Sequence, residues 1–287
     1  EVVCGNRPSR VPADYVEDDR LQLTDVSRKA VPQKGPMRIR GNGLRLLPER
    51  LVARAHKVLE EHAVPINYVA GTSAGSLIGA LYCSGRRWAE IRDFVADVNW
   101  GDLLQPALFS MGLVNPSKLE KMLDNLISNR TFEELEIPLT VVAVDLLTGE
   151  LIEFHEGSVA RAVRASSSIP GIFSPLEWDG KLLVDGGVLN NVPADIVKAM
   201  GADIVIAVDV NANAIKQQGP ENVFDVMMYS MRIMLDDETR IKENADFLIR
   251  PDLEGFSYYN LRNAEKLMDL GEAAAREQIP KIVAAVT

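Results

Sequence analysis

One serine in the chain stands in a sequence context that is typical of a nucleophile. Ser73 lies between Gly71 and Gly75, after the apolar stretch 66–70 and before the apolar stretch 74–84. This pattern predicts a strand, a Gly-x-Ser-x-Gly turn and a buried helix, which together make a nucleophile elbow. The glycines let strand and helix approach closely, and the helix N-terminus favours a developing negative charge. The alternative is a serine that only caps a helix.

A serine hydroxyl needs a proton acceptor within hydrogen-bond reach, and histidine is the usual one. The chain has three histidines, and no acid lies between His62 and Ser73 to complete a triad in the order His, Asp, Ser. The order Ser, acid, His leaves His155, with Asp145 or Asp102 as the orienting acid. A surface residue on a strand is the simpler interpretation of His155.

A carboxylate that acts directly is the remaining base. Asp185 ends the apolar stretch 182–184, and Gly186 and Gly187 behind it permit a tight turn with close backbone approach. An aspartate at the end of a strand in a parallel sheet occupies the edge where α/β active sites are built. The alternative is a hairpin turn that begins at Asp185. Because Ser73 needs a base, the two residues together favour the catalytic interpretation.

Strand and helix patterns alternate along the chain, which predicts an α/β fold of three layers around a mainly parallel central sheet. Residues 1–35 are expected to form a polar N-terminal arm or tether, and residues 36–287 one catalytic domain. Strands are expected at 37–40, 66–70, 139–146, 151–155, 176–178, 181–184, 204–210 and 247–250, and helices at 48–62, 74–84, 87–98, 115–128, 159–166, 194–200, 222–244 and from 262 onward.

Composition narrows the class of function. The 287 residues are 47% hydrophobic and 25% charged, which suits a globular protein with a large core. The net charge of −10 argues against a nucleic-acid partner. Two cysteines make no disulfide framework. No signal peptide or transmembrane segment is visible in the sequence, and whether a targeting segment precedes Glu1 stays open, as does a cytoplasmic or exported location. The oligomeric state stays open as well.

The stretch 99–114 carries more Leu, Phe and Met than a solvated loop needs. Exposed apolar surface often marks an interaction site, so this loop is the candidate for a lid or a membrane-facing rim. The alternative is an irregular segment that packs on the core.

The segments around Ser73 and Asp185, together with 165–173 between them, resemble the patatin-like phospholipase family. The resemblance is strong from about residue 57 to residue 210. It implies the patatin-like fold and a Ser73–Asp185 dyad that works without histidine, metal or other cofactor. It also implies hydrolysis of acyl esters in phospholipids or other lipids, of the phospholipase A or lysophospholipase type, with transient contact at a membrane surface.

The resemblance also assigns the groups that would hold the oxyanion and the substrate: Gly41, Asn42, Gly43, Arg45 and the amide of Ala74. The family's loop reads Gly-Gly-Gly-x-Arg-Gly, whereas here asparagine replaces the middle glycine and leucine the last one. Such loops supply backbone N–H donors. An ordinary surface turn at 41–46 is the alternative, and it would make the protein a lipid-binding relative with weakened catalysis.

Overall fold

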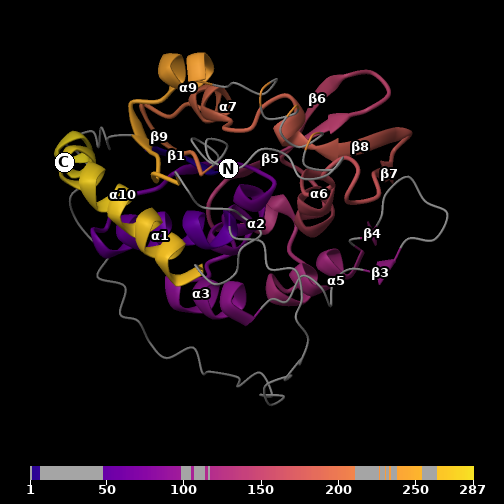
Figure 1. Ribbon diagram of the computed structural model, residues 1–287, viewed down its shortest axis with the longest axis horizontal. Coiled ribbons are helices and arrows are strands. Elements are labelled where there is room, and N and C mark those ends of the chain that lie inside the picture. Colours follow the sequence, from indigo (N-terminus) through magenta and orange to yellow (C-terminus); the bar gives the residue numbers. More distant parts are fainter. Residues whose placement is uncertain are drawn as a thin grey trace, which may run out of the picture.

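A central sheet lies between two layers of helices in the computed structural model (Figure 1). The structure describes residues 2–6, 48–97, 105–106, 114–115, 117–210, 226, 230, 233, 238–253 and 264–287. In Figure 1, α7 and α9 cover one face of the sheet, and α1, α2, α3, α5, α6 and α10 lie on the other. The α/β class and the three-layer arrangement expected from the sequence are confirmed.

The bounds of the elements follow. The strands of the main sheet are β1 (Val2–Asn6), β2 (Tyr68–Thr72), β5 (Leu139–Asp145), β6 (Glu150–Phe154), β7 (Leu176–Trp178), β8 (Lys181–Asp185), β9 (Ile204–Val208) and β10 (Phe247–Ile249), and β3 (Gln105–Pro106) pairs with β4 (Val114–Asn115). The helices are α1 (Pro48–Glu61), α2 (Ala74–Cys83), α3 (Trp88–Asp97), α5 (Ser117–Leu126), α6 (Val159–Ser166), α7 (Ala194–Ala199), α9 (Glu238–Asn244) and α10 (Ala264–Val286).

The main sheet has the order β10-β9-β1-β2-β5-β8-β7, with β6 also paired to β5. Five strands, β2, β5, β7, β9 and β10, run in one direction, as expected of a mainly parallel sheet. β1 runs against its neighbours β2 and β9, and both β6 and β8 run against β5. The antiparallel pairs come from the β5–β6 and β7–β8 hairpins, from β1, and from β8, which returns to β5 after α6.

β1 differs from the expectation of a polar arm outside the core. Val2–Asn6 pair through their backbone with β2 on one side and with β9 on the other. A five-residue strand that is set by two neighbours from distant parts of the chain leaves no periodic pattern of its own. The rest of the predicted arm and the predicted strand at 37–40 lie outside the described residues.

Alternation along the strands divides the core into two layers. Val69, Val141 and Ile206 are buried with the apolar faces of α1, α2 and α10. The next residue of each strand, Ala70, Val142 and Ala207, is buried with α7 on the opposite face. Successive strand side chains point to opposite faces, so a sheet covered on both sides needs apolar residues at every position. β5 comes close to this: all seven of its residues are buried, and all but Thr140 and Asp145 are apolar.

α10 closes the first layer by packing along α1 (Figure 1). Close approach is possible because Gly271 faces the backbone of Leu51, where a Cβ would come within 3.0 Å of the carbonyl oxygen. None of the helices in the described part of the chain is both long and apolar enough to cross a membrane.

An ion cluster joins the polar sides of α1 and α10. The Glu272 carboxylate accepts hydrogen bonds from Arg54 at 2.8 Å, Lys57 at 2.9 Å and Arg276 at 2.7 Å. The hydrogen bond from Lys57, with help from Arg276, lowers the pKa of Glu272 from 4.5 to about 2. A carboxylate whose pKa is lowered on folding stabilises the folded state above its ordinary pKa, and that stabilisation is lost as the pH falls toward 2.

We expect Glu272→Gln to lower the free energy of unfolding by about 1 kcal/mol, and Tm by about 3 °C, at pH 7. The amide keeps the shape but loses the charge that three cations share. The difference in Tm from the unmodified protein should narrow between pH 4.5 and pH 2. Glu277→Gln, at an exposed position on the same helix, is the control. Equal Tm values for Glu272→Gln and the unmodified protein at pH 7 would contradict the role of the cluster.

Candidate active site

The two residues singled out in the sequence meet along one edge of β5. β2 pairs with Leu139–Val142, and β6 pairs with Val141–Asp145. A strand has two edges, so β2 and β6 lie on opposite sides of β5. β8 pairs with Ala143–Asp145, and β6 pairs with the same residues along its own edge of β5. β8 must therefore lie along the other edge of β5, the one that β2 uses, just beyond the residue where β2 ends. The two strands therefore run toward each other, and Ser73 follows one while Asp185 ends the other.

The turn after β2 has the backbone that its sequence predicts. Ser73 adopts φ 52° and ψ −122°, a left-handed conformation that costs a non-glycine residue about 1–2 kcal/mol. α2 begins immediately afterwards and passes so close to β2 that a Cβ on Gly71 would lie 2.7 Å from the backbone of Gly75 and Ser76. The Ser76 hydroxyl donates to the Ser73 carbonyl at 2.6 Å, which fixes the turn.

Asp185 is buried, with 6% of its surface exposed. Burial raises the pKa of its carboxyl group from 3.8 to about 6, against hydrogen bonds from the Ser73 hydroxyl and from the Gly187 amide that lower it. The Gly187 N–H donates to Oδ1 at 2.8 Å. Gly186 has no room for a side chain, because a Cβ there would collide with the carbonyl oxygen of Val142. The structure thus brings a serine hydroxyl and a buried carboxylate into hydrogen-bond contact.

The end of α6 is bonded to both residues. The Ser73 N–H donates to the hydroxyl of Ser166 at 2.8 Å, and the Asp185 N–H donates to the carbonyl of Ser168 at 3.0 Å. Ser166 and Ser168 are both fully buried. Residues 165–173 carry part of the family resemblance, but the sequence alone indicated no role for their serines. The feature of the sequence that could have indicated this role is the run of three serines, 166–168, at the end of an apolar helix, because buried hydroxyl groups need hydrogen-bond partners.

The N-terminus of α2 faces the same place. Its first residue, Ala74, is half-buried, and within the described part of the chain its N–H donates to no acceptor. Unpaired N–H groups at a helix start, together with the helix dipole, favour an anion. An oxyanion formed at Ser73 would lie next to this amide.

The structure keeps His155 away from Ser73. β6 places Phe154 opposite Val141, so His155 lies on the other edge of β5, about 10 Å toward its start from the level of Asp185. The His155 side chain is exposed. Asp145 is bonded to the amides of Leu147 and Leu182, so it anchors a turn and orients no histidine. Asp102 lies outside the described residues.

Several expected site residues cannot be placed. Gly41, Asn42, Gly43 and Arg45, and all of the loop 99–114 except β3 and β4, lie outside the described residues. Over the ranges that the structure describes, no three His, Cys, Asp or Glu side chains are grouped as a metal site would require.

Comparison with known sequences agrees with this arrangement of elements. The sequence model of the patatin-like phospholipase family matches residues 51–198, more than half of the chain. The chain belongs to the patatin-like phospholipase family. The match includes α1, β2, α2, β5, α6, β8 and α7, and so every described element that contributes to the contact between Ser73 and Asp185.

Relatives in this family are found in bacteria and mammals. An uncharacterized NTE family protein of Mycobacterium tuberculosis is 33% identical over 159 residues, which are 55% of this chain and 44% of that protein. The human patatin-like phospholipase domain-containing protein 6 is 36% identical over 168 residues, which cover 54% of this chain and 12% of that protein. The chain thus spans less than half the length of these relatives.

A solved structure shares the fold. VipD from Legionella pneumophila superposes with a TM-score of 0.58 at 12% identity, over 83% of this chain and 66% of that one. At this identity the likeness concerns the fold alone. Membership of the patatin-like phospholipase family supports a lipid hydrolase function for the chain.

Proposed function

We propose that this protein is a serine lipid acyl hydrolase of the phospholipase A or lysophospholipase type, with Ser73 as nucleophile and Asp185 as general base. The observation that carries the proposal is the hydrogen bond between the Ser73 hydroxyl and the buried Asp185 carboxylate, formed where β2 and β8 run toward each other. A carboxylate whose pKa is near 6 is ionised at neutral pH, yet is more basic than an exposed aspartate.

In the first half of the reaction, the Ser73 Oγ attacks the acyl carbonyl carbon of the lipid ester while its proton passes to Asp185. The carbonyl oxygen becomes an oxyanion, and the Ala74 N–H stabilises it. The C–O bond to the alcohol then breaks, and the proton held by Asp185 passes to the departing alkoxide. The acyl group remains as an ester on Ser73.

In the second half, Asp185 takes a proton from a water molecule that attacks the acyl-enzyme carbonyl. The intermediate collapses, the proton returns to the Ser73 oxygen, and a fatty acid leaves. No metal takes part in this scheme. A second oxyanion donor would come from the segment 41–45, with Gly43 as the closest contact and Arg45 as an anchor or phosphate contact.

The substrate is an acyl-ester lipid, in keeping with the patatin-like phospholipase names of the mammalian relatives. Phospholipids reside in bilayers, so the protein would contact a membrane surface during turnover. The roles of Ser73 and Asp185 can be tested by substituting each residue separately.

We expect Asp185→Asn to lower kcat on a soluble short-chain ester by at least about 100-fold, because Asn keeps the shape of the side chain but accepts no proton. Ser73→Ala should abolish turnover. His155→Ala should leave kcat and KM unchanged, since His155 lies across β5. Each variant is assayed with its far-UV circular dichroism as a check on folding, and an organophosphonate should label the unmodified protein only at Ser73.

Activity retained in Asp185→Asn but lost in His155→Ala would overturn the dyad and favour a Ser-Asp-His hydrolase. A folded protein that binds lipid yet is not labelled at Ser73 would be the lipid-binding relative with weakened catalysis.

The pH dependence follows from the pKa of Asp185. Only the ionised carboxylate acts as base, and its pKa is about 6, so kcat/KM should fall tenfold per pH unit below pH 6 and level off above it. The measurement is kcat/KM on a soluble ester between pH 4.5 and 8. A midpoint at 4 would mean that Asp185 titrates like an exposed aspartate in the active protein, and a flat profile would mean that it is not the base.

A further inference from the structure

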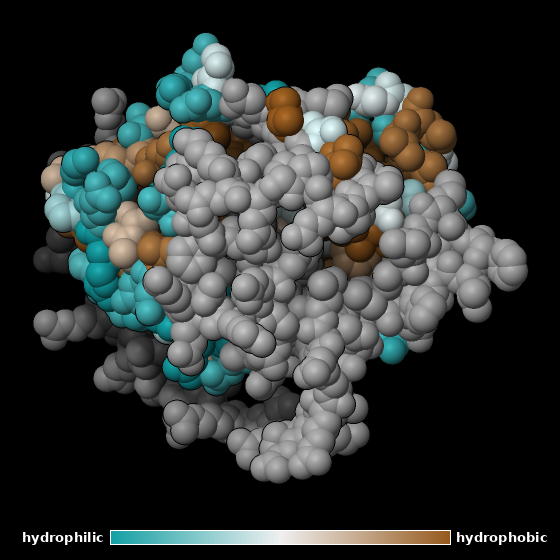
Figure 2. All heavy atoms as spheres, in the orientation of Figure 1, coloured by the Kyte–Doolittle hydropathy of each residue, from teal (hydrophilic) through white to brown (hydrophobic). Residues whose placement is uncertain are grey.

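Large apolar side chains are exposed in the segments that follow β5 and β8. Leu146 is 53% exposed and Leu147 is 70% exposed, in the turn that follows β5. Leu189, four residues after Asp185, is 40% exposed. Figure 2 shows apolar surface gathered over the end of the molecule where Figure 1 places β6, β7 and β8. These side chains gain no free energy of burial on folding, and apolar surface of this kind that stays exposed points to an interaction surface.

The turn that carries Leu146 and Leu147 is held rigidly. The Asp145 carboxylate accepts from the Leu147 N–H at 3.2 Å, from the Leu182 N–H at 3.1 Å and from the Thr148 hydroxyl at 3.1 Å. The Leu146 N–H donates to the carbonyl of Leu182 at 2.8 Å, which ties the turn to β8. A preformed turn pays little ordering entropy when it binds. The two leucines are therefore presented in a fixed geometry.

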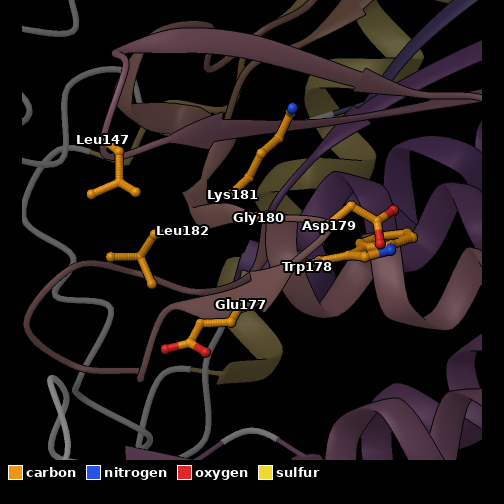
Figure 3. A pocket seen from close by; sticks show the side chains of 7 residues that line it. All are labelled: Leu147, Glu177, Trp178, Asp179, Gly180, Lys181 and Leu182. Atoms are coloured by element: carbon orange, nitrogen blue, oxygen red, sulfur yellow. The ribbon is translucent and has the colours of Figure 1, made fainter.

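Beside the turn lies an open hollow of ≈370 Å³ on the β7–β8 hairpin. Figure 3 shows the side chains of Leu147, Leu182 and Glu177 on one side of this hairpin, while Lys181 points to the other. Leu147 and Leu182 thus extend the apolar surface from the turn along the hairpin, and Glu177 borders it.

The charge around this surface restricts its partner. Glu150, Glu177 and Asp179 are exposed in the turn and the hairpin, whereas Lys181 is half-buried. The chain as a whole carries −10. Anionic lipids would be repelled by such a border, while the ammonium group of a choline headgroup would be attracted to it. Apolar leucines at the centre and carboxylates at the border fit a zwitterionic bilayer.

We propose that the β5–β6 turn, with Leu146 and Leu147 at its tip, inserts into zwitterionic phospholipid bilayers and delivers the site to its substrate. The delivery rests on the proposed lipid hydrolysis, whereas the insertion can be measured without turnover. Asp145 connects the two regions, because it ends the strand along which Ser73 and Asp185 meet and it holds the inserting turn.

The test is co-sedimentation of the full chain, carrying Ser73→Ala so that no lipid is consumed, with phosphatidylcholine vesicles. Adding Leu146→Ser and Leu147→Ser should weaken the partition coefficient by about 100-fold, roughly tenfold for each leucine withdrawn from the bilayer. Mixing phosphatidylserine into the vesicles should weaken binding of the chain that keeps both leucines, compared with its binding to pure phosphatidylcholine. Ala284→Ser with Ala285→Ser, at exposed positions of α10, is the control and should bind normally.

Equal vesicle binding with and without the two leucines would overturn the proposal, and so would stronger binding to phosphatidylserine. A change in oligomeric state caused by the leucine variants, measured by light scattering without lipid, would instead assign this surface to a second copy of the chain. Failure of hydrolysis alone leaves the vesicle result standing, so the two proposals fail separately.

A second inference comes from different contacts. Ser73 has a strained backbone, and its backbone N–H donates to the hydroxyl of Ser166. Ser166 is completely buried. We infer that Ser166 is a positioning residue: it holds the Ser73 backbone in the left-handed conformation that directs the hydroxyl at Asp185. This role also rests on the proposed function, because it acts through Ser73.

The test compares two single-hydroxyl deletions. Ser166→Ala removes the acceptor of the Ser73 N–H and should lower kcat on a soluble ester by about tenfold or more with little change in KM. Ser84→Ala, the control, removes a buried hydroxyl that donates to Leu81 at 2.7 Å, at the far end of α2. It should lose similar thermal stability but keep kcat.

Equal kcat values for the two variants at matched stability would overturn the positioning role of Ser166. A rise in KM without a fall in kcat would also overturn it, because the loss would then concern substrate binding. An unmodified protein that hydrolysed no ester would overturn the proposed function and, with it, the positioning role, which acts through Ser73.

Discussion

One edge of β5 sets the arrangement on which the site depends. β2 pairs with the first part of that edge and β8 with the last part. Because β2 and β8 run in opposite directions, both strands end at the same point of β5. The residue after β2 and the residue that ends β8 are brought together by backbone hydrogen bonds alone, before any side chain is considered. β5 can hold this position because it is buried along its whole length. The rigid strand thereby fixes two flexible side chains in contact, which is the placement that a precise site requires.

The free-energy costs of the conformation of Ser73 and the burial of Asp185 are offset by contacts with the surrounding elements. Ser73 holds an unfavourable backbone conformation and Asp185 buries a carboxylate, and each would be unstable in isolation. The end of α6 bonds to the N–H of both residues, while Gly71 and Gly186 let backbone approach where any side chain would collide. The strain is therefore supported by packing from three elements that lie far apart in the sequence.

The sequence was informative where local chemistry determines structure. The elbow around Ser73, the strand ending at Asp185 and nearly all of the described helices follow from short-range patterns, so they could be predicted. β1 could not, because its place depends on two neighbours that are distant in the chain. The bracing by Ser166 and the exposure of Leu147 also escaped, since each depends on which residues meet in three dimensions. The apolar loop at 99–114 was noticed for its composition, whereas the strand predicted at 139–146 included Leu146 and left only Leu147 before the turn.

The place of β1 has a consequence for how the chain folds. Among the strands that the structure describes, β9 and β10 join β2 and β5 only through β1. Until Val2–Asn6 are inserted, β2 and β9 each have an open edge, and closing the sheet requires contacts between the chain's beginning and its later third. Such long-range closure is slow, and open strand edges promote pairing between molecules. β1 therefore completes the sheet, and a partly folded chain in which it is not yet paired exposes strand edges through which such chains can aggregate.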